Sequence, residues 1–244
     1  MEKKVAIHQP NYLPWPGYFY KLWLSDSFVF LNHVKLNKQG LTRRTFIPKL
    51  SALNEKTYLT VPLIKHPDNS IIKDLKIDHS KDWSTQHFDK LKQLYYRAHA
   101  TSPLWDHLAY WYKTSSQFEY LAEWNEYLIK ELILYLGFDR NTVNSSTLQI
   151  AGVKDEMHTE ILSKIGGSVY ISGASGTVYR QDSSFANSGI KVVDTDFLSF
   201  MKKHPYKTTD FQPGLNILDM IFTLGKAGTI SYFENYNEVK PKLC

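Results

Sequence analysis

"KVAIHQPNYLPWPGYFYKLWLSDSFVFLN", residues 4–32, decides the fold class of this chain. Residues 4–8 form a short apolar run that is typical of a buried strand and that stops at a proline-rich loop. Residues 18–25 predict a helix, which is entered through prolines and a glycine and left at a serine and an aspartate. Residues 27–32 predict a second strand. A strand, a helix and a strand so close together form a βαβ unit, which implies a parallel sheet.

The rest of the chain adds strands and helices to this unit. Residues 56–64 and 71–77 predict two strands that turn residues join as a hairpin. Helical spacing of apolar residues then predicts a helical insertion at about 82–140. The remaining expected elements are a helix over 155–165, strands that begin at 168 and 189, and a last helix over 214–226. The sequence therefore predicts one α/β domain, residues 1–244, with a mostly parallel, Rossmann-like sheet and that insertion.

The composition is that of a globular protein with a mildly basic balance. Apolar residues make up 43% and charged residues 22% of the 244, and the formal net charge is +5. A positive balance favours anionic partners such as phosphates, nucleotides or nucleic acid without choosing among them. Aromatic residues make up 14%, and this high content suits ring-stacking sites as well as a core.

Several classes of site and protein are disfavoured. The one cysteine, Cys244, excludes a disulfide framework and a cysteine-based zinc site. The nine histidines are scattered without metal-binding spacing, so no metal site is expected. The N-terminus lacks the apolar core of a signal peptide, and no apolar run reaches the ~18 residues of a membrane helix. A cytoplasmic protein without membrane insertion is therefore expected.

The loop after the first strand, residues 8–18, is stiff, aromatic and polar at once. Its three prolines fix the backbone, which lowers the cost of ordering it around a ligand. It leaves the carboxyl end of a parallel strand, where ligands bind in open α/β sheets. The alternative is a structural loop whose rings cap the core. The side chains that could contact a ligand are those of His8, Gln9, Asn11, Tyr12, Trp15 and Tyr18.

Two further loops follow strands and carry groups that suit anions. Lys38 and Arg44 lie in a basic loop, and ammonium and guanidinium groups suit a phosphate or pyrophosphate, although a solvated basic loop is an equal alternative. The turn after the strand at 168 is rich in glycine and serine, and its amide groups could cradle an anion. A plain tight turn has the same composition. The candidate residues there are Ser172, Gly173, Ser175 and Gly176.

Four motifs together resemble those of the WbqC-like protein family. They are "IHQPNYLPWPGYF", "LTRRTFI", "YISGASGTVY" and "HPYKTTDFQPGLNILDMIFTLGK", in the order and at about the spacing of that family. The resemblance covers nearly the whole chain, and the first motif is the most specific. In the second motif, family members usually show a tryptophan and an Asn-Arg-Asn group, of which only Arg44 matches here. The last motif adds Asp219 to the candidate substrate-binding residues.

The resemblance implies a role in the biosynthesis of bacterial surface glycans such as O-antigen, lipopolysaccharide and capsule. One setting of the family makes a sugar whose amine bears an N-acylated glycine, which implies modification of an amino sugar. The hypothesis is a transferase that N-acylates or aminoacylates a nucleotide-linked amino sugar. No cofactor is expected beyond an activated acyl or aminoacyl donor. An aminoacyl-tRNA as donor would suit the basic charge, although no RNA-binding motif supports it.

Roles follow for the candidate residues. His8 is the expected general base for the attacking amine, because an imidazole titrates near working pH, and Tyr12 and His33 are the reserve candidates. The rings of the opening loop are expected to stack on a base or sugar. Arg44, Lys38 and the glycine–serine loop are expected to hold the pyrophosphate.

Two other functions remain open at the level of sequence. One is a non-catalytic module that binds a sugar nucleotide or scaffolds glycan assembly. The other is a nucleic-acid-binding protein, which the wide spread of the basic residues disfavours.

Overall fold

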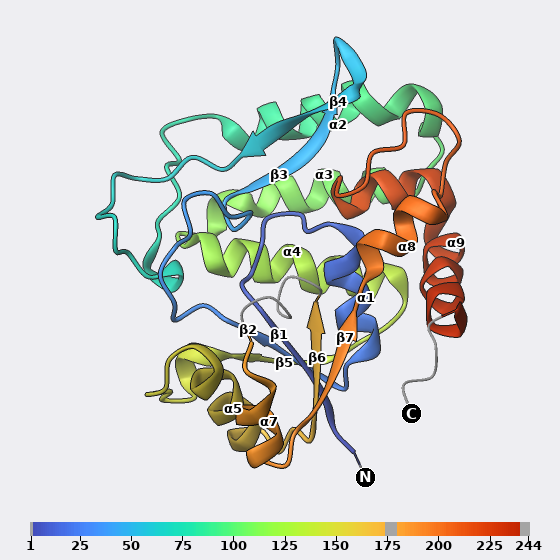
Figure 1. The fold of residues 1–244 in the computed structure, drawn as a ribbon. Helices are drawn as coiled ribbons and strands as arrows, with labels where there is room; N and C mark the ends of the chain where they lie inside the picture. Colours follow the sequence, from blue (N-terminus) through green and yellow to red (C-terminus); the bar gives the residue numbers. More distant parts are fainter. Residues whose placement is uncertain (1, 174–179, 240–244) are drawn as a thin grey trace.

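The central sheet of the computed structural model, which describes residues 2–173 and 180–239, consists of five parallel strands (Figure 1). β1 lies in the middle and pairs with β2 on one side and β6 on the other. The predicted α/β class with a parallel, Rossmann-like sheet is therefore confirmed. In spatial order the strands are β5 (Asn141–Asn144), β2 (Ser27–Phe30), β1 (Lys4–His8), β6 (Val169–Gly173) and β7 (Lys191–Thr195).

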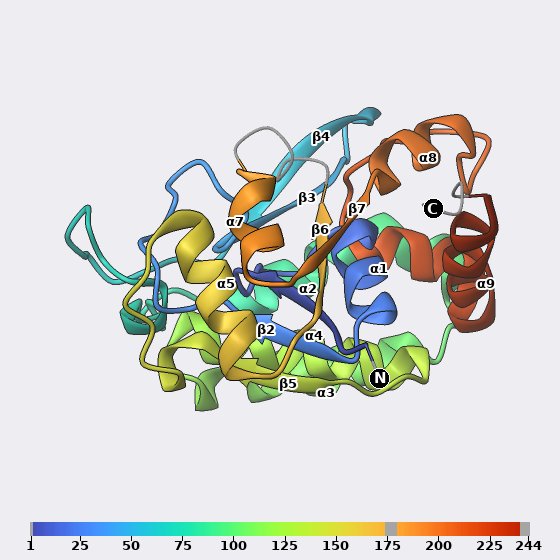
Figure 2. The same ribbon diagram turned by 60° about the horizontal axis from the view of Figure 1, so that its bottom comes forward.

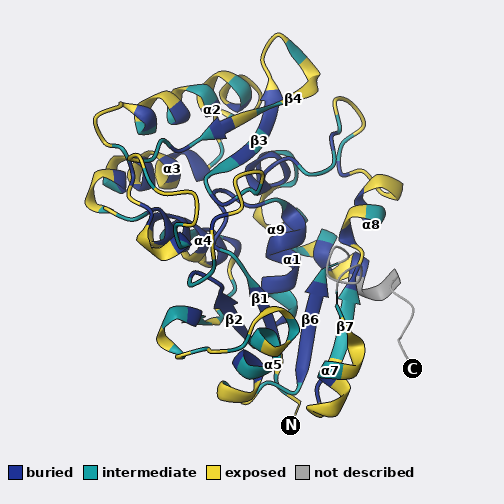
Figure 3. Cartoon of the chain, turned by 60° about the vertical axis from the view of Figure 1, so that its left-hand side comes forward, coloured by how far each residue is buried: buried dark blue, intermediate teal, exposed yellow. Residues whose placement is uncertain are grey.

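Helices cover both faces of the sheet, because successive side chains of a strand point to opposite sides. Val5 and Ile7 are buried in a cluster with α5 (Lys154–Lys164) and α7 (Asp182–Asn187). Ala6, between them, belongs to the larger cluster on the other face. Figure 2 shows these layers, and Figure 3 shows that β1 and β6 are buried between them. The larger cluster includes residues of α1 (Pro16–Leu24), α4 (Leu121–Leu136) and α9 (Ile217–Val239).

Three helices follow one another in the chain before β5. They are α2 (Trp83–His99), α3 (Leu104–Thr114) and α4, and they lie above the sheet in Figure 1. α4 ends at Gly137, where a φ of 87° favours glycine and forms the C-terminal cap. The division into one domain with a helical insertion at about 82–140 stays a prediction. In that prediction, α2, α3 and α4 are the inserted part. None of the described helices is long and apolar enough to cross a membrane.

The predicted hairpin of residues 56–64 with 71–77 is wrong. Residues 56–60 belong to β4 (Ala52–Thr60), which pairs antiparallel with β3 (Arg44–Lys49). Residues 71–77 contain the 3₁₀ helix η1 (Ile72–Asp74) instead of a strand. Residues 56–64 and 71–77 are joined by one isolated β-bridge, between Leu63 and Ile77. Ile72 and Ile77 are nevertheless buried, so the apolar composition reflects burial rather than strand pairing.

The sequence patterns do not indicate β5, α7 or α8 (Phe197–Lys203). β5 has the sequence NTVN, which has little strand character by itself, and it forms a strand because it pairs in parallel with β2. α7 and α8 have six and seven residues, and so few turns leave no clear helical period.

Candidate functional site

A cavity of about 280 Å³ lies at the carboxyl ends of β1, β6 and β7 and is here called the strand-end pocket. Ligands bind at this edge of the sheet in open α/β folds. The walls come from the opening loop with α1, from the ends of β6 and β7, and from the start of α8, which are far apart in the sequence. The lining residues are Ile7, His8, Trp15, Gly17, Tyr18, Lys21, Tyr170, Ser172, Gly173, Thr195, Phe197 and Leu198.

His8, the last residue of β1, lines the pocket as a neutral imidazole. Its Nδ1 hydrogen-bonds to the backbone oxygen of Gln9 at 3.1 Å, so Nδ1 carries the proton and Nε2 is left as an acceptor. Its ring meets that of Tyr18 edge-on, with centroids 4.8 Å apart. Burial, with a smaller effect of the Lys21 ammonium, lowers the pKa of His8 to about 3. His8 is therefore neutral at physiological pH and can accept a hydrogen bond, but it does not titrate near working pH, contrary to the expectation from the sequence.

Two rings of the opening loop form the adjoining wall. Tyr18 is fully buried, and its hydroxyl donates to the backbone oxygen of Gln9 at 3.1 Å, so it also braces the turn. Burial raises the pKa of Tyr18 well above its usual value, which keeps the phenol neutral. Trp15 is half-buried and meets Phe197 edge-on at 6.3 Å. Trp15 is therefore the ring with surface left for a ligand.

Gly17 should be required for the position of the Trp15 ring. A Cβ at Gly17 would lie 2.2 to 2.6 Å from three ring atoms of Trp15, so Gly17→Ala must displace the ring. We expect the free energy of unfolding, measured with urea, to fall by about 1–3 kcal/mol, as in other overpacked sites. In a Trp15→Ala background the same change should cost little, because the obstacle is absent. An equal cost in both backgrounds would show that the ring is not the obstacle.

Lys21 of α1 lines the same pocket, although the sequence patterns do not single it out. It is 6% exposed, and its Nζ donates to the backbone oxygen of Ile7 at 3.4 Å. Burial lowers the pKa of Lys21 to about 8. In the sequence it interrupts the otherwise apolar and aromatic run "YFYKLWL". A lysine among residues that must be buried is the signal that could have indicated it.

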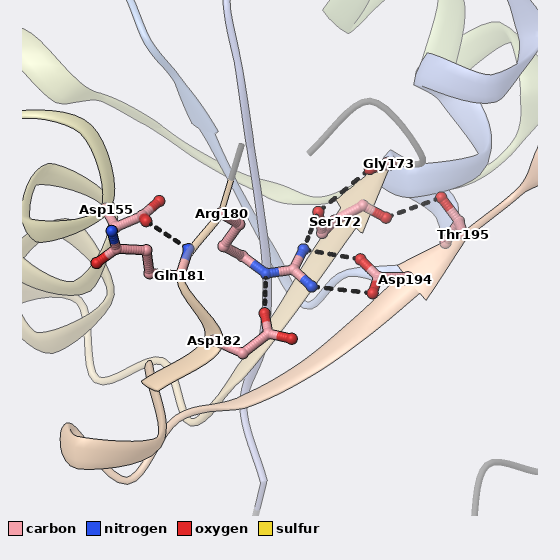
Figure 4. A network of polar contacts seen from close by, with 8 residues as sticks. All are labelled: Asp155, Ser172, Gly173, Arg180, Gln181, Asp182, Asp194 and Thr195. Carbon is pink, nitrogen blue, oxygen red and sulfur yellow. Dashed lines mark hydrogen bonds and ion pairs between the residues drawn. The ribbon is translucent and has the colours of Figure 1, made fainter. Parts of the chain in front are cut away.

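Arg180 ties the ends of β6 and β7 together beside the pocket (Figure 4). Its guanidinium donates to both carboxylate oxygens of Asp194, at 2.8 and 3.0 Å, and to the Ser172 hydroxyl at 2.8 Å. Its Nε donates to Asp182 at 2.6 Å. Because forked Arg–carboxylate pairs fix geometry, Arg180 positions Ser172 without itself lining the cavity. The sequence patterns do not indicate this residue.

The end of β6 contributes Ser172 and Gly173 to the pocket. The Ser172 hydroxyl donates to the Gly173 oxygen at 3.3 Å, and the Thr195 hydroxyl donates to the Ser172 oxygen at 3.0 Å. Both hydroxyl protons are therefore used within the protein. The predicted residues Ser175 and Gly176 lie outside the described residues, and the anion cradle in this turn stays a prediction.

Lys38 and Arg44 do not line the strand-end pocket. Lys38 forms an exposed ion pair with Asp68 at 2.6 Å. Arg44 begins β3, donates to two backbone oxygens of its own loop, and lies over the Tyr58 ring at 4.4 Å. Both positive groups have partners of their own, so their contact with a pyrophosphate in this pocket stays a prediction without geometric support.

Gln9 and Asn11 direct their amide oxygens toward Thr42, and neither residue is among those that line the pocket. Gln9 Oε1 accepts from the Thr42 hydroxyl at 3.1 Å, and Asn11 Oδ1 lies 3.5 Å from the same group. Asn125 of α4 then donates to the backbone oxygens of Pro10 and Thr42, at 2.8 and 2.7 Å. These contacts hold the opening loop in place, and direct binding of a substrate by the two amides stays a prediction.

Tyr12 is fully buried where the opening loop meets α2 and α3. Its hydroxyl lies 2.9 Å from Nδ1 of His87 and 2.5 Å from the hydroxyl of Tyr112. Burial and Tyr112 raise the pKa of Tyr12 well above its usual value. Tyr12 is not among the residues that line the strand-end pocket, so its contacts are those of a core residue and its catalytic role stays a prediction.

His87 should make the fold sensitive to acid. It is 7% exposed, and burial lowers its pKa from 6.5 to about 4. The unfolded chain therefore takes up the proton first as the pH falls. The contribution of neutral His87 to the free energy of unfolding is complete above pH 6.5 and is lost as the pH falls towards 4. Between pH 7 and pH 4.5 this loss should be about 2–3 kcal/mol.

Urea unfolding at pH 7 and pH 4.5 tests this effect. The loss of stability on acidification should be smaller by that amount in His87→Asn than in the wild type. The partly exposed His66 provides the control, and His66→Asn should follow the wild type. Parallel curves for the wild type and His87→Asn would contradict the prediction.

Comparison with known protein families identifies the family of this chain. The model of the WbqC-like protein family matches residues 9–230, most of the chain. The chain belongs to the WbqC-like protein family. It is also 29% identical over 224 residues to the uncharacterized protein Rv1507c of Mycobacterium tuberculosis, with 91% of this chain and 94% of that protein covered. No solved structure shows a significant match.

In this WbqC-like chain, His33 follows β2 and lies on the side of β1 away from β6. Its Nδ1 hydrogen-bonds to the Ser145 hydroxyl at 2.6 Å, and burial lowers its pKa. The neighbouring Asn32 donates to Glu126 of α4 at 3.2 Å. His8 ends β1 and His33 follows the adjacent strand β2, but His33 is not among the residues that line the strand-end pocket, and its role with a substrate stays a prediction.

Asp219 of this WbqC-like chain is 1% exposed in the first turn of α9 and lies outside the pocket lining. Its carboxylate accepts from the Tyr206 hydroxyl at 2.5 Å, the Tyr95 hydroxyl at 3.2 Å and the Lys207 ammonium at 2.9 Å. A buried carboxylate with three such partners needs no ligand to satisfy it. Its predicted contact with a substrate therefore stays a prediction.

The motifs of the WbqC-like family thus separate in space. The opening motif and the start of the turn after β6 meet at the strand-end pocket, whereas Arg44 and Asp219 are placed elsewhere. Within the described residues, no group of three or more His, Cys, Asp or Glu side chains is arranged to hold a metal ion.

Proposed function

We propose that this WbqC-like protein is a transferase that N-acylates or aminoacylates the amine of a nucleotide-linked amino sugar. The observation that carries the proposal is the neutral His8, with Nε2 available, beside Trp15 in the strand-end pocket. Family membership supports the setting, which is cytoplasmic assembly of bacterial surface polysaccharide such as O-antigen, lipopolysaccharide or capsule.

The reaction needs a proton acceptor near the amine. The amine nitrogen attacks the carbonyl carbon of the activated acyl group, the bond to the leaving group breaks, and the nitrogen gives up one proton. Nε2 of His8 would take that proton and pass it to the leaving group. Because its pKa is low, His8 is suited to take the proton from the amine nitrogen while the nitrogen–carbon bond forms, when that proton becomes acidic. It is less suited to take a proton from a free ammonium group.

The volume of the pocket suits one sugar ring rather than a whole sugar nucleotide. About 280 Å³ is just below the usual ~300–1,000 Å³ of small-molecule sites. In the proposal, the ring that bears the amine stacks on Trp15, and the nucleotide extends past the ends of the strands. Stacking on an aromatic face selects for ring shape.

A thermal-shift screen followed by a product assay tests the proposal. UDP- and dTDP-linked amino sugars, ATP, acyl-CoA and charged tRNA are compared, because a ligand at ~100 times its Kd adds ~2.7 kcal/mol of stability. We expect stabilisation by a sugar nucleotide and by a donor, and a product whose mass has grown by one acyl or aminoacyl group.

The other outcomes separate the alternatives. Stabilisation by a sugar nucleotide with no donor and no product would point to a binding or scaffold module of glycan assembly. Stabilisation by tRNA alone would point to a nucleic-acid-binding protein. Either result, or no stabilisation by any compound, would contradict the transferase.

A further inference from the structure

Lys21 is a buried cation that pairs with no carboxylate of the described residues. Its side chain lines the strand-end pocket and is 6% exposed. An ammonium group can donate three hydrogen bonds, and the described one is a long bond of 3.4 Å to the backbone oxygen of Ile7. None of the ion pairs formed within residues 2–173 and 180–239 involves Lys21.

Two other buried charges of the described residues are compensated by ion pairs. Asp219 pairs with Lys207 at 2.9 Å, and the Arg180 guanidinium, whose side chain is 6% exposed, pairs with Asp194 at 2.8 Å. Such pairing is general, because a buried ion without a partner costs several kcal/mol. Lys21 departs from this rule at the wall of a cavity, where a ligand could supply the missing charge.

In the described part of the chain, the groups whose pKa the Lys21 ammonium lowers are two histidines. His8 faces it from β1 and His158 from α5, and the Lys21 ammonium contributes to lowering the pKa of both. Burial raises the pKa of Tyr170 in β6 to about 12, so this phenol stays neutral. Burial by itself lowers the pKa of Lys21 to about 8, and the amine is therefore still largely protonated at pH 7.

We infer that Lys21 is the anion-binding residue of the strand-end pocket and holds a carboxylate or phosphate group of the ligand. An anion would accept the free hydrogen bonds of the ammonium and offset the cost of its burial. Lys38 and Arg44 have partners elsewhere, so Lys21 takes over the role expected of them. The inference rests on the proposed function only in taking this pocket as the ligand site.

The position of His8 adds a second requirement on the ligand. Nε2 of His8 is an acceptor, so a group with an N–H or O–H suits it. The ligand class is therefore a small molecule, or the end of a larger one, that carries an anionic group for Lys21 and an amine or hydroxyl for His8.

Three sugars that differ in charge test the inference by calorimetry at pH 7. Glucosamine has no anionic group, glucosamine 1-phosphate carries a phosphate, and glucuronate carries a carboxylate. The wild type should bind at least one of the two anionic sugars at least tenfold more tightly than glucosamine, and the preferred sugar identifies the anion. Equal binding of all three, or no binding of either anionic sugar, would overturn the inference.

Variants then assign the preference to Lys21. Lys21→Met removes the charge but keeps the length, and it should lose about 10–100-fold in affinity for the preferred anionic sugar, the range of a charge-assisted hydrogen bond. Lys21→Arg should retain most of the affinity, and Lys38→Met is the control that should change nothing. A folded Lys21→Met with unchanged affinity would overturn the inference.

A measurement on the wild type does not depend on the variants folding. The Lys21 ammonium should show in NMR a rise of its pKa when inorganic phosphate or acetate is added, because an adjacent anion favours the charged form. No rise with either anion would count against the inference. Anion binding without acyl transfer would instead leave the inference intact and contradict the proposed transferase.

Discussion

The His8→Asn variant is expected to keep its fold and most of its affinity for a sugar nucleotide, but to lose about 10²–10⁴-fold in turnover. The amide of an asparagine can still donate to the Gln9 backbone oxygen, as Nδ1 of His8 does at 3.1 Å. It cannot act as the proton acceptor that Nε2 of His8 provides. The variant therefore separates the bracing of the turn from the chemistry.

The pH dependence of turnover provides a second test of His8. Because burial lowers its pKa to about 3, His8 stays neutral as the pH falls from 8 to 5. We therefore expect turnover per bound substrate to show no acid loss in that range from His8. Wild-type turnover in His8→Asn would remove the general-base role. A parallel loss of stability and affinity would show that His8 only braces the turn.

Asp219→Ala is expected to lower the free energy of unfolding by about 3–5 kcal/mol, measured with urea at pH 7. The change leaves the Lys207 ammonium without its 2.9 Å partner and two buried tyrosine hydroxyls, of Tyr95 and Tyr206, without their acceptor. The cost is large because the two tyrosine hydroxyls stay buried without an acceptor, and the Lys207 ammonium, whose side chain is 20% exposed, loses its carboxylate.

Two controls distinguish this structural role from substrate binding. Asp219→Asn keeps an oxygen acceptor and should lose less stability, with sugar-nucleotide affinity unchanged because Asp219 does not line the pocket. Asp68→Ala removes an exposed partner of Lys38 and should cause no measurable change. A stable Asp219→Asn with strongly reduced affinity would instead support the predicted contact of Asp219 with a substrate.

The fold was predictable wherever local pattern and tertiary environment agree. The strand at 4–8, the helix after it and the strand at 27 each have a clear apolar period and turn residues at both ends, so the βαβ unit follows from the sequence. Residues 71–77 show where this agreement ends. Their apolar side chains indicate burial, but burial without a neighbouring strand gives a 3₁₀ turn instead of a hairpin.

The candidate site was predictable in part for the same reason. The sequence indicated that His8, Trp15 and Tyr18 follow the carboxyl end of a parallel strand, and all three line the pocket. It could not indicate that Lys38 and Arg44 have partners elsewhere, because a basic loop has the same composition on either side of the molecule.

By itself, the sequence determined the parallel α/β class, the WbqC-like family and the loop that forms one wall of the pocket. Only the tertiary structure decided that β5 pairs with β2, that Arg180 joins the ends of β6 and β7, and that Lys21 is a buried ammonium with no counter-ion in the part of the chain that the structure describes. The physical reason is that pairing, charge compensation and burial depend on which distant residues meet. Local periodicity records only which face of an element is apolar.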